Sequence, residues 1–109
     1  DEFVKYDGTG QAELVRSGQV SALELVEAAI ARIEKINPIL NAVVHKIYDE
    51  GRATAKGPLP DGPFKGVPYL IKDLSELKGA PLTYGSRLFE HLSPTRTMAV
   101  SSAQSRPVL

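Results

Sequence analysis

The sequence predicts an α/β fold, because it contains one strongly amphipathic helical segment and two short apolar segments typical of strands. The helix is expected at Ser21–Asn37 and the strands at Ala42–Ile47 and Val67–Ile71. A chain of 109 residues suffices for one domain. A domain of this size buries roughly 60–70 % of the surface that its unfolded chain exposes. We therefore expect a single domain over residues 1–109, with helices followed by short strands.

Charge and composition argue against several classes of partner. The chain carries 13 acidic and 13 basic side chains, so its net charge of zero gives no electrostatic case for nucleic acid or anionic lipid. It has no cysteine, which excludes a disulfide framework and a thiolate metal site and favours a cytoplasmic location. No apolar run approaches the roughly 18 residues that a membrane helix needs. We expect no cofactor, metal, nucleic acid or membrane partner.

A short helix is expected near the start of the chain, after an arm at residues 1–6. Asp7–Gly10 supplies residues that favour a helix N-terminus, and Gln11–Arg16 follows as the helix itself. Gly18 stands where a glycine commonly follows a helix end. The apolar stripe is narrow, so this helix depends on tertiary packing.

The segment Ser21–Asn37 carries the strongest helix signal in the sequence. Ser21 and Glu24 have the spacing of a capping box. The apolar positions at helical spacing are Ala22, Val26, Ala29, Ile30, Ile33 and Ile36. Asn37 precedes Pro38, and because a residue before proline avoids helical geometry, the helix is expected to end there. We predict a structural role for this helix.

Two elements of opposite character follow. Ala42–Ile47 is apolar and β-branched, which predicts a strand. His45 lies within it without neighbouring metal-ligand residues, so we interpret it as a partly exposed strand histidine rather than a metal ligand. Tyr48–Lys56 mixes charged and small side chains and is expected to form a polar helix.

The most informative segment is the predicted strand Val67–Ile71, which follows a proline- and glycine-rich loop at Lys56–Gly66. Pro68 has no N–H and therefore belongs at an edge, a bulge or the strand start. Lys72 follows the strand, and open α/β sheets place their chemistry at the carboxyl ends of strands. The alternative is a surface lysine whose stem packs while its ammonium stays in water. Asp73 follows directly.

Turn residues dominate the chain after this segment. Gly79–Pro81 predicts a turn and Thr83–Ser86 a loop. Arg87–Leu92 is expected to form a short helix, whose start Ser86 could cap. Glycine and serine are common in turns for conformational reasons, so this loop by itself indicates a structural role and not a functional one.

The blocks that carry a family resemblance are Gly66-Val67-Pro68, Lys72-Asp73-Leu74 and Gly79-Ala80-Pro81-Leu82-Thr83-Tyr84-Gly85-Ser86. Together they resemble the first block of the amidase signature family, most strongly over Gly62–Ser86 and more weakly over residues 7–92. Enzymes of that family hydrolyse carboxamides with a Ser–cis-Ser–Lys triad. The resemblance implies an N-terminal fragment of a mixed-sheet amidase fold, with Lys72 as the catalytic base and Asp73 as a structural partner.

The remaining parts of such a triad are not found in this sequence. A lysine becomes a base only when its surroundings lower its pKa from about 10.4 toward about 7, which corresponds to roughly 4 kcal/mol. The resemblance places both serines in a Gly-Gly-Ser-Ser-Gly-Gly motif several dozen residues beyond the lysine. Ser101 and Ser102 have no adjacent glycine and do not match that motif. We therefore expect a small-molecule amide substrate for the full-length family and no hydrolysis by the isolated chain.

Residues 95–109 have no periodicity and do not resemble the family. Shifting the reading frame by one base near Thr95 permits an amidase-like continuation. We hypothesise that this atypical tail is a frameshift product. The coding DNA tests this against the alternative of a proteolytic or cloned fragment.

Two functional interpretations remain open from the sequence. The first is a fragment of an amide hydrolase. The second is a non-catalytic remnant or a protein-interaction module, which would keep the helices and one or two strands. In the second case an exposed strand edge and apolar surface predict self-association or segment swapping.

Overall fold

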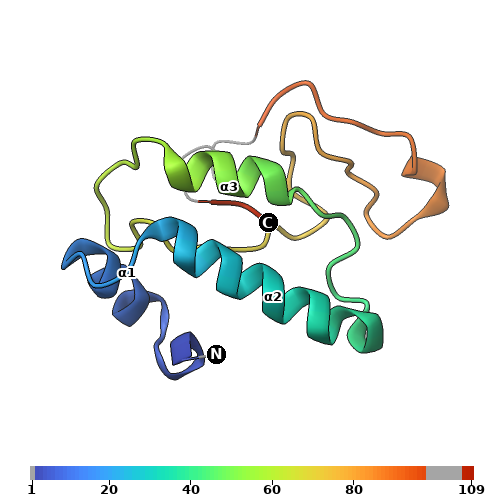
Figure 1. Cartoon of the computed structure of the whole chain (residues 1–109). Coiled ribbons are helices and arrows are strands. Elements are labelled where there is room, and N and C mark those ends of the chain that lie inside the picture. The colour runs from blue at the N-terminus through green and yellow to red at the C-terminus, as the bar shows by residue number, and fades with distance from the viewer. Residues whose placement is uncertain (1, 98–106) are drawn as a thin grey trace. The chain divides into compact units, whose positions relative to one another are not determined.

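The computed structural model describes residues 2–97 and 107–109, whose course is shown in Figure 1. These residues fall into two compact units. The first contains the described residues of 1–69 and 106–109, and the second those of 70–105. The division follows Tyr69 and therefore lies inside the predicted strand Val67–Ile71.

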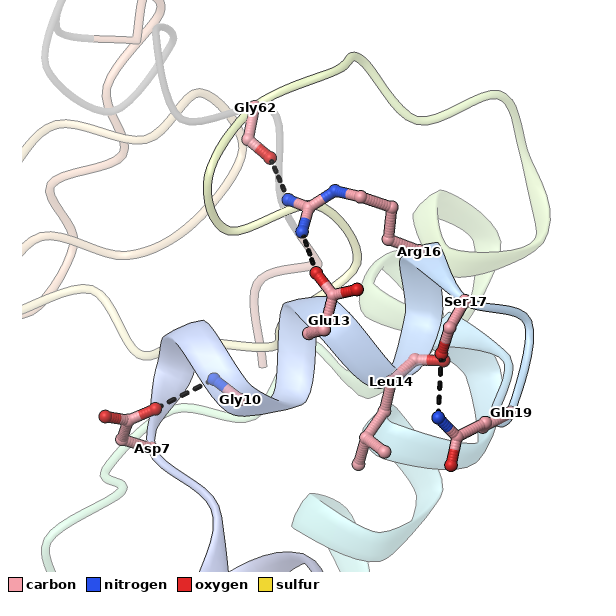
Figure 2. Close-up of polar contacts among 8 residues, drawn as sticks. All are labelled: Asp7, Gly10, Glu13, Leu14, Arg16, Ser17, Gln19 and Gly62. Atoms are coloured by element: carbon pink, nitrogen blue, oxygen red, sulfur yellow. Dashed lines mark hydrogen bonds and ion pairs between the residues drawn. The ribbon is translucent and has the colours of Figure 1, made fainter.

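The first unit begins with a 3₁₀ turn, η1 (Glu2–Lys5), and the helix α1 (Gly8–Arg16). The helix starts at Gly8 rather than at the expected Gln11, because the carboxylate of Asp7 accepts a hydrogen bond from the Gly10 N–H at 2.8 Å (Figure 2). The expected glycine past the helix end is confirmed, since Gly18 has a φ of +75°.

One side chain of α1 holds the loop that leads to the predicted strand. The guanidinium of Arg16 pairs with Glu13 at 2.5 Å and also donates to the carbonyl oxygen of Gly62 at 3.4 Å (Figure 2). Gly66 lies further along the same loop and packs closely against the helices, because a Cβ there would lie 3.0 Å from the Ala22 Cβ and 3.1 Å from Val15. Its φ of +77° is also one that side-chain-bearing residues avoid.

Helix α2 (Ala22–Leu40) confirms the predicted capping box. The Ser21 hydroxyl accepts from the Glu24 N–H at 3.1 Å, and the Glu24 carboxylate accepts from the Ser21 N–H at 2.7 Å. The predicted end at Asn37 is wrong, because the helix continues through Pro38 to Leu40. Proline in the last turn removes only one helical N–H donor, and Asn41 then closes the helix in the left-handed conformation.

The predicted strand at Ala42–Ile47 is also wrong, because these residues form an irregular connection. The side-chain amide of Asn37 replaces a strand partner. Its nitrogen donates to the Val43 carbonyl oxygen at 2.9 Å, and its oxygen accepts from the Val43 N–H at 2.8 Å. His45 is exposed on this connection, and no cluster of metal-ligating side chains occurs among the described residues.

The predicted polar helix is confirmed as α3 (Tyr48–Lys56), which lies alongside α2 (Figure 1). The core cluster of this unit consists of Val26, Ile30 and Leu109. Four partly buried side chains pack on that cluster: Ala29, Ile33, Tyr48 and Ala55. The residue 109 end of the chain is therefore part of the helical core.

Ion pairs at the surface connect α3 and the preceding connection to α2. Arg52 binds both carboxylate oxygens of Glu27, at 2.6 and 3.1 Å. Glu34 accepts from the Lys46 ammonium at 2.6 Å and from the Tyr48 hydroxyl at 2.7 Å. Burial and this hydrogen bond raise the pKa of Tyr48 to about 12.

The predicted strand Val67–Ile71 is reduced to one parallel bridge between Tyr69 and Val108. A strand needs a partner along its length, and within the described residues Tyr69 alone of this segment is paired. Pro68 contributes no donor. The mixed sheet expected from the sequence is therefore absent from the described part of the chain, whose regular elements are all helical.

In the second unit, the described residues 70–97 contain one short regular element, the 3₁₀ turn η2 (Arg87–Phe89). The helix predicted at Arg87–Leu92 is thus shorter than expected, although Ser86 does cap its start by accepting from the Leu88 N–H at 3.3 Å. The atypical tail falls partly outside the described residues. No described helix in either unit has the length and apolar content of a bilayer-spanning segment.

Candidate active-site segment around Lys72

The candidate catalytic residue, Lys72, lies in the second unit on an irregular, turn-forming segment. Its carbonyl oxygen accepts from the N–H groups of Leu74 at 2.7 Å and Ser75 at 3.0 Å. These bonds bend the chain directly after the lysine, so the prediction that Lys72 ends a regular strand is wrong. Its assignment as a catalytic base stays a prediction.

The side chain of Lys72 is exposed. Within residues 2–97 and 107–109, its ammonium has neither an ion-pair partner nor a hydrogen-bond acceptor. The alternative of a solvated surface lysine therefore describes this residue in the isolated chain. A lysine in such surroundings lacks the desolvation that a base role requires.

Asp73 organises the loop that faces this segment. One of its carboxylate oxygens accepts from the Thr83 N–H at 2.7 Å, and the other accepts from the Thr83 hydroxyl. The Thr83 hydroxyl oxygen in turn accepts from the Gly85 N–H at 3.2 Å. These contacts attach the loop 83–86 to the residue next to Lys72.

The same contacts fix the ionisation of the Asp73 carboxyl group. The Thr83 hydroxyl, followed by the Thr83 backbone N–H, lowers the pKa of Asp73 below its ordinary value of 3.8. A carboxylate that accepts several hydrogen bonds is a structural anchor at neutral pH rather than a proton donor. This geometry agrees with the structural role expected for Asp73.

The hydroxyl groups of the loop are used in turn formation. The Ser86 N–H donates to the Thr83 carbonyl oxygen at 2.8 Å, and the Ser86 hydroxyl caps η2. Tyr84 has a φ of +52° and stacks edge-on against Phe89, with 5.5 Å between the ring centres. Neither Thr83 nor Ser86 is therefore presented as a free nucleophile.

The chain beyond the loop folds back along the same unit. Leu82 donates its N–H to the Leu92 carbonyl oxygen at 3.0 Å, and its side chain is buried. Arg96 pairs with Glu76 at 3.0 Å, so the start of the atypical tail contacts this unit. The pair Ser101–Ser102 lies outside the described residues.

Sequence reasoning missed the role of Thr83. The sequence analysis considered the glycine and serine of the loop, whereas the structure shows that the Asp73 carboxylate accepts hydrogen bonds from Thr83. No local signal was available, because Thr83 lies ten residues beyond Asp73, whereas the turn patterns of aspartate join it to backbone groups within a few residues. The sequence also does not indicate which residue of the loop binds the Asp73 carboxylate, because several residues of the loop have N–H groups or hydroxyls.

Comparison with known proteins identifies relatives of this segment. The model of the amidase family matches residues 24–102, which include Lys72 and the loop that Asp73 holds. The 6-aminohexanoate-cyclic-dimer hydrolase of Paenarthrobacter ureafaciens is 51 % identical over 69 residues, which are 63 % of this chain and 14 % of that protein. A putative amidase of Mycobacterium bovis is 41 % identical over 91 residues, or 83 % of this chain and 19 % of that protein.

Solved structures agree with these sequence relatives. A 6-aminohexanoate cyclic dimer hydrolase complexed with substrate aligns with a TM-score of 0.85 and 34 % identity over 95 % of this chain and 22 % of that one. A bacterial aryl acylamidase of the amidase signature family aligns with a TM-score of 0.82 and 34 % identity, covering 95 % of this chain and 24 % of that one. The chain thus spans between about a seventh and a quarter of the length of these relatives.

Proposed function

Because the chain belongs to the amidase family, we propose that it carries the lysine-bearing part of an amide hydrolase, with Lys72 as the base of a Ser–cis-Ser–Lys triad. The supporting observation is the family match over residues 24–102, which spans Lys72 and its neighbouring loop. The substrate class that follows is a carboxamide, in keeping with the cyclic-amide and aryl-acylamide enzymes among the relatives.

The proposed chemistry divides the work between this segment and residues outside it. A bridging serine relays the proton of the nucleophilic serine to the neutral amine of Lys72 as the serine oxygen attacks the amide carbon. The proton then passes to the leaving amine when the C–N bond breaks and leaves the acyl group on the serine. Water, which gives its proton to the same relay, then attacks this ester, releases the carboxylic acid and restores the serine hydroxyl. Asp73 and Thr83 position the segment and do not touch the reacting atoms.

This role requires surroundings that the isolated chain lacks. We propose that the segment Val67–Ile71 becomes a longer strand of a mixed sheet in a complete amidase fold, and that this fold buries Lys72. Burial would then supply the desolvation that a lysine base needs. Since Lys72 is exposed in the 109-residue chain, we propose that this chain alone does not hydrolyse amides.

A fluorophosphonate probe, which reacts with activated serines, tests the inactivity of the isolated chain. We expect no labelling of the purified 109-residue protein, under conditions in which an intact amidase is labelled. Labelling that is lost on denaturation would contradict the proposal, because it would require a nucleophile activated within this chain.

A graft tests the role of Lys72 itself. Residues 24–97 of this chain would replace the matching segment of the Paenarthrobacter ureafaciens hydrolase, and hydrolysis of the cyclic dimer would be measured. We expect activity in the graft, and a loss of about 10² to 10⁴-fold in kcat for Lys72→Met, the range that a general base contributes.

Lys78→Met in the same graft is the matched control, because Lys78 is also an exposed lysine of this unit. We expect its kcat to stay within about threefold of the unsubstituted graft, as for an ordinary surface substitution. Equal losses in the two variants, with folded proteins in both cases, would remove Lys72 from the triad.

A second candidate function is self-association as a non-catalytic interaction module. It is supported by exposed apolar side chains at the end of α2 and just after it: Ile39 is 86 %, Leu40 64 % and Val44 66 % exposed. Light scattering over a concentration series tests it. We expect a mass above the monomer that falls in the double variant Ile39→Glu, Leu40→Glu, and a strict monomer in the unsubstituted chain would refute this function.

A further inference from the structure

The segment Pro107–Leu109 is bound to the first unit by main-chain hydrogen bonds of a parallel strand pair. The Tyr69 N–H donates to the Pro107 carbonyl oxygen at 3.0 Å, and the Leu109 N–H donates to the Tyr69 carbonyl oxygen at 3.2 Å. Both backbone groups of Tyr69 are thus satisfied by this segment. Such pairing is how one extended peptide adds to another without regard to side chains.

The side chains of the segment alternate, as expected for an extended peptide. Pro107 is fully buried and Leu109 is 5 % exposed, whereas Val108 between them is only partly buried. Leu109 joins Val26 and Ile30 of α2 in the core cluster. The surface that buries Pro107 and Leu109 should therefore prefer an extended peptide with apolar residues at its first and third positions.

Gly51 of α3 forms a notch for this segment. A Cβ at Gly51 would lie 2.6 Å from the Val108 carbonyl oxygen and 2.7 Å from a methyl carbon of Leu109. Figure 1 shows the segment, in red, close to α3. Glycine is unfavourable inside a helix, and this close approach gives a reason for its presence at the middle of α3.

We propose that Gly51, Val26, Ile30 and the backbone of Tyr69 form a receptor site for one extended apolar tripeptide, which Pro107–Leu109 occupies as an internal ligand. We name this surface the tripeptide site. Its ligand class is an extended Pro-Val-Leu type of peptide, recognised by parallel pairing and by two buried side chains. The inference is independent of any catalytic role for Lys72.

Amide hydrogen exchange of Tyr69 in the full 109-residue chain tests the notch, because that amide donates into the segment. Gly51→Ala should make the Tyr69 amide exchange about 100-fold faster, since the segment is expelled. Gly57→Ala is the matched control at the end of the same helix, where the nearest atoms to a new Cβ are carbonyl oxygens of α3 at 3.6 and 3.7 Å. Equal protection in the two variants would overturn the proposal.

A second experiment holds even if Gly51→Ala unfolds the chain. Leu109→Asp in the full chain places a carboxylate in the apolar core and should release the segment. We expect a synthetic peptide with the sequence of residues 105–109 to restore slow exchange at Tyr69 in this variant, and a peptide with Asp in place of its leucine to fail. No restoration by the first peptide would overturn the receptor site.

Size measurements distinguish an internal ligand from a segment exchanged between two copies. For an internal ligand, Gly51→Ala changes the Tyr69 exchange rate without changing the mass found by sedimentation. A dimer that Gly51→Ala converts to a monomer would overturn internal occupancy, because the segment would then come from the other copy.

Discussion

The two units of the chain are held together in different ways. Among its described residues, the first unit buries eight apolar side chains around its helices: Ala12, Ala22, Leu25, Val26, Ile30, Val67, Pro107 and Leu109. Within residues 70–97, the described part of the second unit, only the apolar side chain of Leu82 is buried, and turns organise this part with the Asp73 carboxylate as their anchor. The difference indicates that packing stabilises the helical unit, whereas a few polar contacts stabilise the unit that carries Lys72.

This contrast places the candidate catalytic residue in the less packed unit. Few buried contacts mean low local stability, so the segment around Lys72 should open more easily than the helices. In a complete amidase the missing packing would have to come from the rest of the fold. The substitutions below test the contrast, from the largest expected effect to the smallest.

Removal of core packing in the first unit should have the largest effect. Leu25 is 2 % exposed on α2, and Leu25→Ala should lower the free energy of unfolding by about 2–5 kcal/mol. Urea denaturation followed by far-UV circular dichroism measures this. Ile39→Ala on the same helix is the control, because Ile39 is 86 % exposed and should change stability by no more than about 0.5 kcal/mol.

A glycine substitution should have the next largest effect. Gly66→Ala would place a Cβ 3.0 Å from the Ala22 Cβ at a positive φ, so we expect a loss of about 2–4 kcal/mol in the same assay. Gly62→Ala is its control, since a Cβ at Gly62 would have no atom within 4 Å. Similar urea unfolding curves for the two variants would show that the loop is not packed against α1 and α2.

In the second unit we expect a smaller and local effect. Asp73→Asn removes the negative charge of the side chain that accepts hydrogen bonds from Thr83. The free energy of opening the turn should fall by about 1–2 kcal/mol. Amide exchange at Thr83 should accelerate while the helical dichroism of the first unit stays unchanged. Loss of that dichroism would mean that the two units unfold together.

The Asp73 carboxylate also predicts a pH dependence of the turn. Its pKa is lower in the folded chain than the ordinary 3.8, so the unfolded turn binds the proton more readily. The stabilisation is therefore present above pH 3.8 and is lost as the pH falls through the folded value. Thr83 amide exchange in the wild type should show this loss, and in Asp73→Asn it should not.

Alkali provides the last and smallest test, this time in the first unit. The pKa of Tyr48 is raised to about 12 in the folded chain. The protonated tyrosine therefore makes its full contribution to the free energy of unfolding below pH 10, and this contribution is lost between pH 10 and about pH 12. Tyr48→Phe removes this dependence and costs about 0.5–1.5 kcal/mol at neutral pH. A wild-type stability that is flat across this window would contradict the raised pKa of Tyr48, which burial and the hydrogen bond to Glu34 cause.

Local signals made the helices predictable from the sequence. Ser21 and Glu24 are neighbours that cap α2 by themselves, and the mixture of charged and small residues at 48–56 was sufficient for α3. The strands failed because pairing is non-local. No sequence pattern near residue 43 predicts that the Asn37 side chain bonds both backbone groups of Val43. Likewise, no pattern near Tyr69 predicts that Val108 pairs with it.

The candidate site was predictable in identity but not in surroundings. Lys72 was found from a short sequence pattern and a family resemblance, both of which are local. Its exposure depends on which residues from other parts of the chain pack over it, and the sequence around Lys72 does not indicate these residues. Gly51 gave an overlooked signal, because a glycine in the interior of a helix commonly marks a close approach.

The order Asn37-Pro38 has a consequence for chemical ageing. Asparagine degrades when the next backbone nitrogen attacks the side-chain amide, with loss of ammonia and closure of a five-membered imide ring. Proline nitrogen carries no hydrogen and cannot complete that reaction. The amide that binds both backbone groups of Val43 is therefore protected from deamidation by the same residue that interrupts the hydrogen bonding of α2.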